Sequence, residues 1–329
     1  TQGSEGPMMI RDIARLDPKS VELWNEERWT KVAGFSKTKR NGDELELVLR
    51  SGERISCTPS HRFPTSRGLL DARDITVGDC LQSVNLPEPI SPLTPSHLGE
   101  DAAWFAGLYI AEGSRTGDTI QLAGHSKEIR RWERVRQIAQ DYGGSATLHT
   151  GGNKQVIRVY GLLLNAIIDR LVSGRLAYGK GFDPIVWSYS NGFLRSLLQG
   201  YLDGDGAWDE QNKRWRLGFT RNYNLERDIR TLAARLGLHL TLKLAHVKYK
   251  YNGIESIRPT FRGELRFERS GHWNERDVNE VVQIRKARCR ELYDIGVEDA
   301  PNLFALASGV LSHNSKRSPM PESLVGTRW

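Results

Sequence analysis

The chain has 329 residues, a formal net charge of +7 at pH 7 and a sequence pI of about 9.3. This length allows two or three domains with buried cores, and the mild basic excess permits nucleic acid as a partner without requiring it. The three cysteines show no metal-ligand spacing and no apolar run is long enough to span a membrane. We therefore expect a soluble, cytoplasmic protein without structural disulfides.

The first ninety residues are predicted to be rich in β-strands. Trp29–Phe35 and Glu44–Leu49 alternate polar and apolar residues, as half-buried strands do. A turn at Ser51-Gly52 leads into a further predicted strand, Arg54–Thr58. The proline-rich stretch 83–99 is predicted to be the linker to a second domain.

From about residue 101 to residue 273 the chain is predicted to repeat the order helix, strand, helix and hairpin. The predicted elements of the first half are the helix Phe105–Glu112, the strand Thr119–Leu122, the helix Lys127–Tyr142 and the hairpin 146–160. Those of the second half are a helix ending at Asp205, the strand Trp215–Phe219, the helix Leu225–Leu236 and a hairpin turning at Asn252-Gly253.

Two stretches, Phe105–Gly113 and Gln199–Gly206, match each other position by position. The matched pairs are Gly107 with Gly200, Ala111 with Gly204, Glu112 with Asp205, and Gly113 with Gly206. Small residues four apart leave one helix face flat, so two such helices can pack closer than the usual 8–10 Å or so. Glu112 and Asp205 would then emerge together, followed by glycines that can end the helices. Two adjacent carboxylates suit a hard divalent cation, Mg²⁺ or Mn²⁺.

These stretches resemble the LAGLIDADG motif of homing endonucleases, present twice as in the single-chain members. The resemblance implies an α+β domain at residues 91–274, built of two pseudo-symmetric repeats at about 100–185 and 190–270. It also implies metal-dependent cleavage of double-stranded DNA, with Glu112 and Asp205 as catalytic residues and metal ligands. We expect this domain to act as a monomer.

Basic residues gather on the two predicted hairpins. A two-stranded ribbon fits the major groove, and long basic side chains reach both phosphates and base edges. The predicted DNA-binding residues are Lys154, Arg158, Lys243, Lys248, Lys250, Arg258, Arg262 and Arg266. For either hairpin alone, the alternative is an ordinary solvated sheet face.

The two ends of the chain carry a second resemblance. Thr58-Pro-Ser-His61 lies between SGERISC and ITVGDCL, and a later YDIGV strand precedes an apolar strand ending in His313-Asn314-Ser315. These stretches resemble the conserved blocks of inteins, which are self-splicing proteins with the Hint fold. The resemblance implies a discontinuous all-β splicing domain, 1–90 and 275–314, interrupted by the endonuclease and followed by a C-extein segment, 315–329.

The splicing residues implied by the resemblance are Thr58, His61, Asp294, His313, Asn314 and Ser315. Thr58 and His61 would activate the upstream scissile amide, and Asp294 would assist proton transfer between steps. Asn314 would cyclise to a succinimide while His313 polarises its carbonyl. The Ser315 hydroxyl would be the nucleophile for transesterification. No cofactor is expected for splicing.

The sequence departs from the intein pattern at two places. Ala300-Pro301 precede Asn302, where inteins usually carry a histidine. No cysteine lies near Thr1, so we expect the upstream nucleophile either before Thr1 or at Ser4.

Two alternative functions remain open. A maturase-like protein would bind DNA or RNA without cutting, and a Hint autoprocessing domain would carry an inert insertion. The two acids, Glu112 and Asp205, disfavour both alternatives. The partners implied are double-stranded DNA at the intein-free host allele and the flanking exteins, with no membrane.

Overall fold

The structure, a computed structural model, describes residues 2–3, 6–39, 42–89, 91–93, 98–151, 154–251, 254–268, 277–287 and 291–314. The chain forms two compact units, and one of them is made from both ends of the chain. That unit comprises residues 1–87 and 268–329, and the other comprises residues 88–267. The fold is mixed α/β, and the paired strands in the described sheets are antiparallel.

The first unit consists mainly of three antiparallel sheets, in the orders β2-β1-β3-β4-β20, β19-β5-β6 and β21-β22-β7-β8. Its early strands are β1 (Gln2–Gly3), β2 (Gly6–Pro7), β3 (Glu22–Trp24), β4 (Trp29–Lys39), β5 (Leu45–Leu49), β6 (Arg54–Cys57), β7 (Arg62–Thr65) and β8 (Gly68–Asp71). Its late strands are β19 (Val281–Lys286), β20 (Glu291–Val297), β21 (Leu303–Ala305) and β22 (Leu311–His313). The short helices are α1 (Ile10–Ile13), η1 (Pro18–Ser20) and η2 (Ala72–Asp74).

Each sheet of this unit joins strands from both ends of the chain. β20 pairs with β4, β19 with β5, and β22 with β7. The alternating side chains of these strands fill two apolar cores, one around Leu47 and Phe63 and the other around Leu23 and Ile295. The strands predicted in the first ninety residues are confirmed as β4, β5 and β6.

The second unit repeats the predicted order of helix, strand, helix and hairpin. The first half contains α2 (Glu100–Glu112), β9 (Gly113–Thr116), β10 (Thr119–His125), α3 (Ile129–Asp141), β11 (Ser145–Gly151), β12 (Lys154–Tyr160) and α4 (Leu162–Leu171). A connection with β13 (Val172–Ser173), β14 (Gly181–Phe182) and η3 (Pro184–Ser188) follows. The second half contains α5 (Asn191–Asp205), β15 (Ala207–Asp209), β16 (Arg214–Thr220), α6 (Tyr223–Leu236), β17 (His239–Tyr251) and β18 (Ile254–Arg266).

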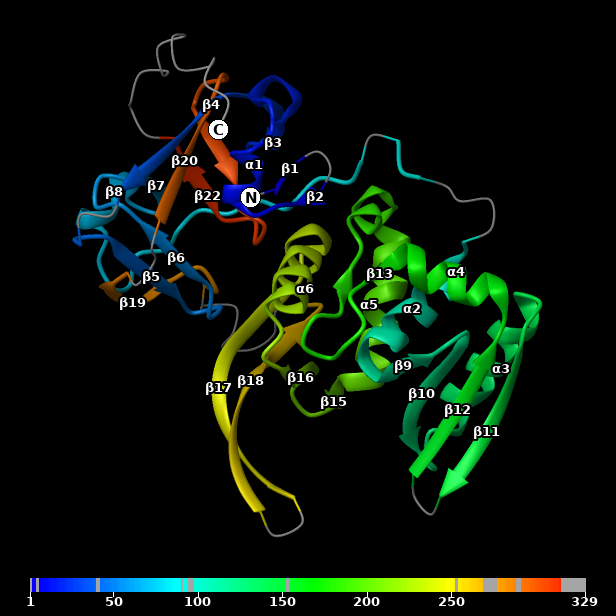
Figure 1. The fold of residues 1–329 in the computed structure, drawn as a ribbon. Coiled ribbons are helices and arrows are strands. Elements are labelled where there is room, and N and C mark those ends of the chain that lie inside the picture. The colour runs from blue at the N-terminus through cyan, green and yellow to red at the C-terminus, as the bar shows by residue number, and fades with distance from the viewer. Residues whose placement is uncertain are drawn as a thin grey trace. The chain divides into compact units, whose positions relative to one another are not determined.

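Each half of this unit contains a four-stranded sheet, β11-β12-β10-β9 in the first and β15-β16-β18-β17 in the second. Figure 1 shows the β11–β12 and β17–β18 hairpins projecting from the helices on the same side of the unit. The sequence did not predict β9, β15 or α4. The strands β9 and β15 are too short to show a period, whereas Leu164, Ile167, Ile168 and Leu171 bury one face of α4 at helical spacing.

The two motif helices, α2 and α5, pack with their backbones in contact, as the small residues predict. A Cβ on Gly107 would lie 2.0 Å from the Leu197 carbonyl oxygen, and one on Gly200 would lie 1.9 Å from that of Trp104. Only glycine fits at either position, because the nearest atoms belong to rigid backbone.

The two helices end at their acidic residues, as predicted. The glycines that follow are needed because a side chain would not fit there, and not because the backbone is left-handed. Gly113 and Gly206 have φ of −82°, which any residue can adopt, so neither is a left-handed cap. A Cβ on Gly113 would lie 2.2 Å from the Tyr109 ring, and one on Gly206 would lie 2.5 Å from the Leu202 carbonyl oxygen. These glycines make room for the chain to turn directly into β9 and β15.

Candidate functional sites

The first candidate site is the carboxylate pair at the ends of α2 and α5. Burial raises the pKa of Asp205 to about 7, and the negative charge of Glu112 adds to the effect. Burial likewise raises the pKa of Glu112. Both acids are half-buried, and two acids held close together with reduced access to water disfavour each other's charge. Such a pair gains from a cation placed beside it.

Two cations that the sequence did not single out face this pair. The Lys180 side chain is buried, and its Nζ donates to the Tyr109 carbonyl at 3.0 Å and the Gly113 carbonyl at 2.9 Å. Burial lowers the pKa of Lys180 to about 8, against the opposing effect of Asp205 and Glu112. Arg131 of α3 places Nη1 3.9 Å from Glu112 Oε1, and burial lowers its pKa as well.

A weak signal for both cations is present in the sequence. Lys180 stands between two glycines, in the connection between the repeats, where a close approach of backbone is common. Arg131 precedes Trp132, which belongs to the apolar face of α3. Neither signal indicates by itself that the side chain reaches the acids.

The donor set of this site fits a hard divalent cation. Carboxylate oxygens are the ligands that Mg²⁺ takes from proteins, usually one or two of them with waters and phosphates completing the shell. Glu112 and Asp205 supply such oxygens, and burial raises the pKa of both acids although Lys180 and Arg131 oppose this. In the described ranges no group of three or more His, Cys, Asp or Glu side chains is arranged to hold a metal.

The strand register divides the predicted DNA-binding residues of the β17–β18 hairpin between its two faces. Lys243 pairs with Arg262, and Arg258 lies on the same face, opposite the buried Leu242 and Phe261. These three basic side chains are exposed. Lys248 and Lys250, also exposed, lie on the other face of the ribbon.

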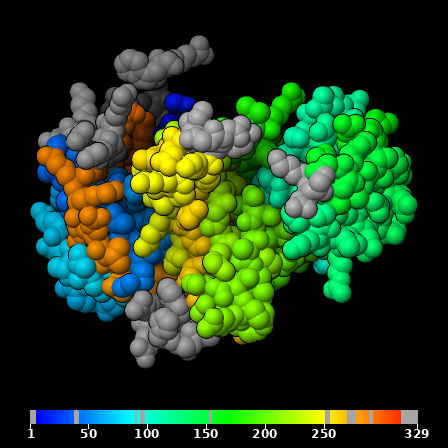
Figure 2. Space-filling model, turned by 90° about the horizontal axis from the view of Figure 1, so that it is seen from below, coloured from blue at the N-terminus to red at the C-terminus, as the bar shows by residue number. Residues whose placement is uncertain are grey.

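Arg158 of the first hairpin is exposed and stands opposite Gln121 and Thr147 on neighbouring strands. Lys154 begins β12, and its side chain lies outside the described residues. Figure 2 shows the unit from below, with the yellow β17–β18 and yellow-green β15–β16 hairpins on one side and the cyan-to-green first repeat on the other.

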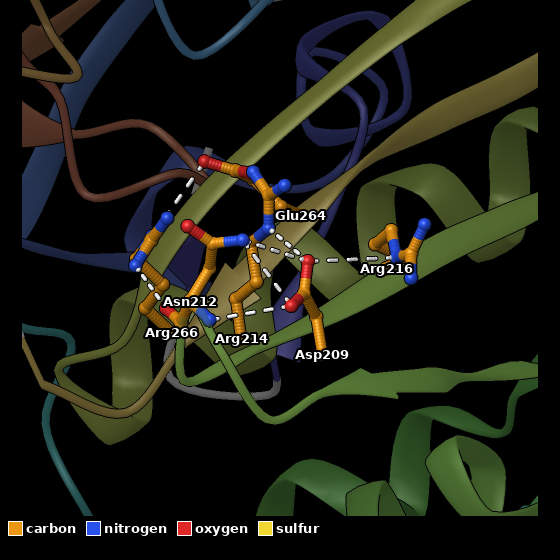
Figure 3. Close-up of polar contacts among 6 residues, drawn as sticks. All are labelled: Asp209, Asn212, Arg214, Arg216, Glu264 and Arg266. Atoms are coloured by element: carbon orange, nitrogen blue, oxygen red, sulfur yellow. Dashed lines mark hydrogen bonds and ion pairs between the residues drawn. The ribbon is translucent and has the colours of Figure 1, made fainter.

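Arg266 does not belong to the exposed basic set that the sequence predicts. Its side chain is buried, donates to the Asn212 carbonyl at 2.7 Å and lies 3.6 Å from Glu264 (Figure 3). The loop that contains Asn212 covers it, which a pattern along one strand does not reveal. Arg214 in the same network binds both Asp209 and Glu264.

Arg216 is a further exposed basic residue, outside the set predicted from the sequence. It pairs in register with Glu264, two positions from Arg262 along β18, and its Nε lies 3.8 Å from Asp209. Its alternation with Trp215 and Leu217 is the period-2 signal that would have identified it.

The second candidate site lies in the unit formed by the two ends of the chain. Thr58, His61 and Asp294 line a cavity of about 530 Å³ together with Ser312. His61 Nε2 lies 2.7 Å from Ser312 Oγ, and His61 Nδ1 lies 4.0 Å from Asp294 Oδ1. Burial lowers the pKa of His61 although Asp294 opposes this. A neutral imidazole at pH 7 is the form that accepts a proton.

His313 is the last residue of β22, and Asn314 follows it, close to Ser312 of this cavity. His313 Nδ1 is 2.6 Å from the Asn314 carbonyl oxygen, and the Asn314 backbone N–H donates to the Asn302 carbonyl at 3.0 Å. Because a carbonyl oxygen only accepts, this short contact fits a proton on Nδ1, whereas Arg62 Nη2, 3.3 Å from the same nitrogen, can only donate and fits the other tautomer. The structure thus brings Thr58, His61, Asp294 and the His313-Asn314 pair into one unit. Ser315, Ser4 and Thr1 lie outside the described residues.

A family model matches the part of the chain that contains this second site. Residues 9–314 match the family model of the intein splicing domain. The chain belongs to the intein splicing-domain family. The match includes both end segments and runs up to Asn314, the residue whose carbonyl contacts His313.

The relatives of this intein are much longer proteins. It is 22% identical over 239 residues to the DNA-directed RNA polymerase subunit Rpo1C of Methanocaldococcus jannaschii. This match covers 60% of the intein and 27% of that subunit. It is 25% identical over 244 residues to the Replication factor C small subunit of the same organism, covering 61% of the intein and 13% of that protein. The chain therefore spans well under half the length of these curated relatives.

Among solved structures, the intein is similar to I-DmoI in complex with DNA and Ca, with 11% identity and a TM-score of 0.32, over 50% of the intein and 82% of that chain. It is also similar to full-length DUF199/WhiA from Thermatoga maritima, with 10% identity and a TM-score of 0.29, over 53% of each chain. No described helix of the intein is long and apolar enough to cross a membrane.

Proposed function

We propose that residues 88–267 of this intein are an inserted, metal-dependent LAGLIDADG endonuclease that cuts double-stranded DNA at the intein-free host allele. The observation that carries this proposal is the pair Glu112 and Asp205, held together by the glycine-packed helices α2 and α5. Lys180 and Arg131 beside them fit a negatively charged substrate.

In this proposal Glu112 and Asp205 would hold the divalent cation through their carboxylate oxygens. Bound there, Mg²⁺ or Mn²⁺ would supply Lewis-acid activation of water and stabilisation of the leaving oxygen. Lys180 and Arg131 offset the charge that gathers on the scissile phosphate. The ribbon residues Arg158, Lys243, Arg258 and Arg262 hold the duplex, joined by Lys154. A ribbon in the major groove has a groove wall on each side, so Lys248 and Lys250 reach phosphates from its other face.

The nuclease is tested with a supercoiled plasmid that carries the intein-free host site, incubated with Mg²⁺. The wild type should linearise it, whereas Glu112→Gln or Asp205→Asn should reduce cutting by about 10²-fold or more or leave a nicked circle. Glu100→Gln, at the opposite end of α2, is the matched control and should cut normally. Equal cutting by both acid variants would remove the acids from the mechanism.

The same experiment separates the alternative functions. A maturase-like protein would shift the plasmid on a gel without cutting it. An inert insertion in an autoprocessing domain would neither bind nor cut, while cleavage at Asn314 continued.

We further propose that the intein excises itself, with the last step at Asn314. The Asn314 side-chain nitrogen attacks the Asn314 carbonyl carbon, the succinimide ring closes, and the bond to Ser315 breaks with a proton passing to the leaving amine. His313 donates to that carbonyl through Nδ1, which stabilises the developing oxyanion. The limited coverage of the two long relatives is the pattern of a removable segment inside a host protein.

Incubation of the purified chain should release Ser315–Trp329, which mass spectrometry detects as a loss of mass. Asn314→Ala should abolish the release because alanine has no amide to cyclise. His313→Ala should slow it by roughly 10²-fold, the usual contribution of one positioned proton donor. Release by Asn314→Ala at the wild-type rate would rule out asparagine cyclisation.

A further inference from the structure

We propose that Asn222, which caps α6 in the second repeat, and Asp228, in the second turn of that helix, are positioning residues for Lys180. They hold the backbone on both sides of this lysine so that its amine is fixed at the carboxylate pair. The proposal rests on the proposed nuclease function for its consequence in catalysis, but the contacts that carry it are independent of that function.

The amine end of Lys180 is anchored by the first repeat. Nζ donates to the carbonyls of Tyr109 and Gly113, which lie on either side of Glu112 along the chain. The side chain is 4% exposed, so a long and flexible amine is confined next to the acids. Burying an ammonium group without such partners would be costly. The Lys180 backbone must therefore lie where the side chain can reach both carbonyls.

The backbone end of Lys180 is anchored by Asn222. The Asn222 Nδ2 donates to the Lys180 carbonyl at 2.7 Å and to the Ala177 carbonyl at 2.9 Å. Its Oδ1 accepts from the backbone N–H groups of Asn224 and Leu225 at 3.2 Å, which caps α6. The side chain is 1% exposed, so one amide group joins the helix start to the lysine segment without solvent.

Asp228 holds the chain on the other side of the lysine. Its Oδ2 accepts from the Phe182 N–H at 2.8 Å, and its Oδ1 accepts from Arg227 at 2.9 Å. A Cβ on Gly181 would lie 2.6 Å from Asp228 Oδ2, which explains the glycine after Lys180. The lysine therefore bridges the two repeats, with its amine on α2 and its backbone on α6.

Asn222 has two roles, capping α6 and binding the Lys180 segment, and they depend on different atoms of its side-chain amide. A helix cap needs only a side-chain oxygen, and serine serves about as well as asparagine there. The contacts to the Lys180 and Ala177 carbonyls need N–H donors that reach both atoms. Asn222→Ser therefore keeps the helix cap and removes the hydrogen bonds to the Lys180 and Ala177 carbonyls.

The test measures Lys180 directly and then its effect on cutting. NMR titration of the chain labelled with ¹³C-lysine, assigned with Lys180→Met, reports the pKa of the amine. In Asn222→Ser this pKa should rise from about 8 towards its ordinary 10.5 as the amine escapes to solvent. Single-turnover cleavage should slow by about tenfold or more, with DNA affinity within about twofold of the wild type.

Controls distinguish positioning from general weakening of α6. Thr231→Val removes a hydrogen bond to the Arg227 carbonyl within the same helix and should leave the Lys180 titration unchanged. In the Lys180→Met background, Asn222→Ser should slow cleavage no further, because both changes act through one group. If Asn222→Ser does not fold, Asn222→Thr keeps a cap oxygen, lacks the amide donors and adds no charge beside Lys180.

An unchanged Lys180 titration in the folded Asn222 variant overturns the proposal, as does additive slowing with Lys180→Met. Failure of the wild type to cut DNA would refute the proposed nuclease but not the positioning. In that case the titration alone decides it.

Discussion

The Asp205 carboxyl is held where its own charge is disfavoured. Burial and the neighbouring Glu112 raise its pKa to about 7, and Lys180 and Arg131 offset only part of this. Because the pKa of Asp205 in the folded protein lies above its ordinary value of 3.8, the folded state keeps a proton that the unfolded chain has already lost. At neutral and higher pH the ionised group therefore lowers the free energy of unfolding.

Asp205→Asn should stabilise the metal-free protein at pH 8, since asparagine cannot ionise. The gain is at most about 4 kcal/mol, the energetic equivalent of the pKa difference. It should be largest above pH 7 and shrink as the pH falls towards 4, where aspartic acid is protonated in both states. Urea denaturation at pH 8 and pH 5 without divalent ions measures it. An asparagine variant less stable than the wild type at pH 8 would contradict this account.

At the scale of elements, the α2–α5 contact determines where the acids emerge. The Gly200 backbone lies against the Trp104 carbonyl, so an added methyl group must push the helices apart. Gly192 in the same helix is different, because the nearest atom to its added Cβ would be Glu100 Oε1 at 3.5 Å.

Gly200→Ala should therefore lower the free energy of unfolding by about 1–3 kcal/mol or more, through overpacking against rigid backbone. Gly192→Ala should be neutral or stabilise by about 0.4–1 kcal/mol, because alanine restricts the unfolded chain. Thermal unfolding of the two variants beside the wild type checks the contrast. Equal effects at both positions would mean that the helices are not in backbone contact.

At the scale of the whole molecule, each unit has apolar cores of its own. Two cores belong to the unit formed by the chain ends, and a third fills residues 88–267. Stability at this scale comes from burial within each unit.

Replacing residues 88–267 with a short Gly/Ser linker should leave the splicing unit folded, and release of Ser315–Trp329 should continue within about tenfold of the full-length rate. The reason is that His61, just before β7, Asp294 of β20 and His313 of β22 all belong to that unit. Circular dichroism and mass spectrometry check both statements, with Asn314→Ala in the shortened chain as the control. Loss of folding would show that the splicing unit depends on the insertion.

Much of this protein was predictable from local sequence. The alternation in Trp29–Phe35 predicted β4, and the paired small residues predicted the contact of α2 with α5. These signals are readable because side-chain period and backbone sterics act over a few neighbouring residues.

Only the tertiary structure decided which basic side chains lie beside Glu112 and Asp205 and which are exposed on the surface. Arg262 and Arg266 lie on the same face of β18, yet the loop at Asn212 buries Arg266 and leaves Arg262 exposed. Lys180 has only its flanking glycines as a local signal, and its backbone carbonyl is bound by Asn222, the cap residue of the distant helix α6. Burial and proximity arise from packing between distant segments, so no window of neighbouring residues contains them.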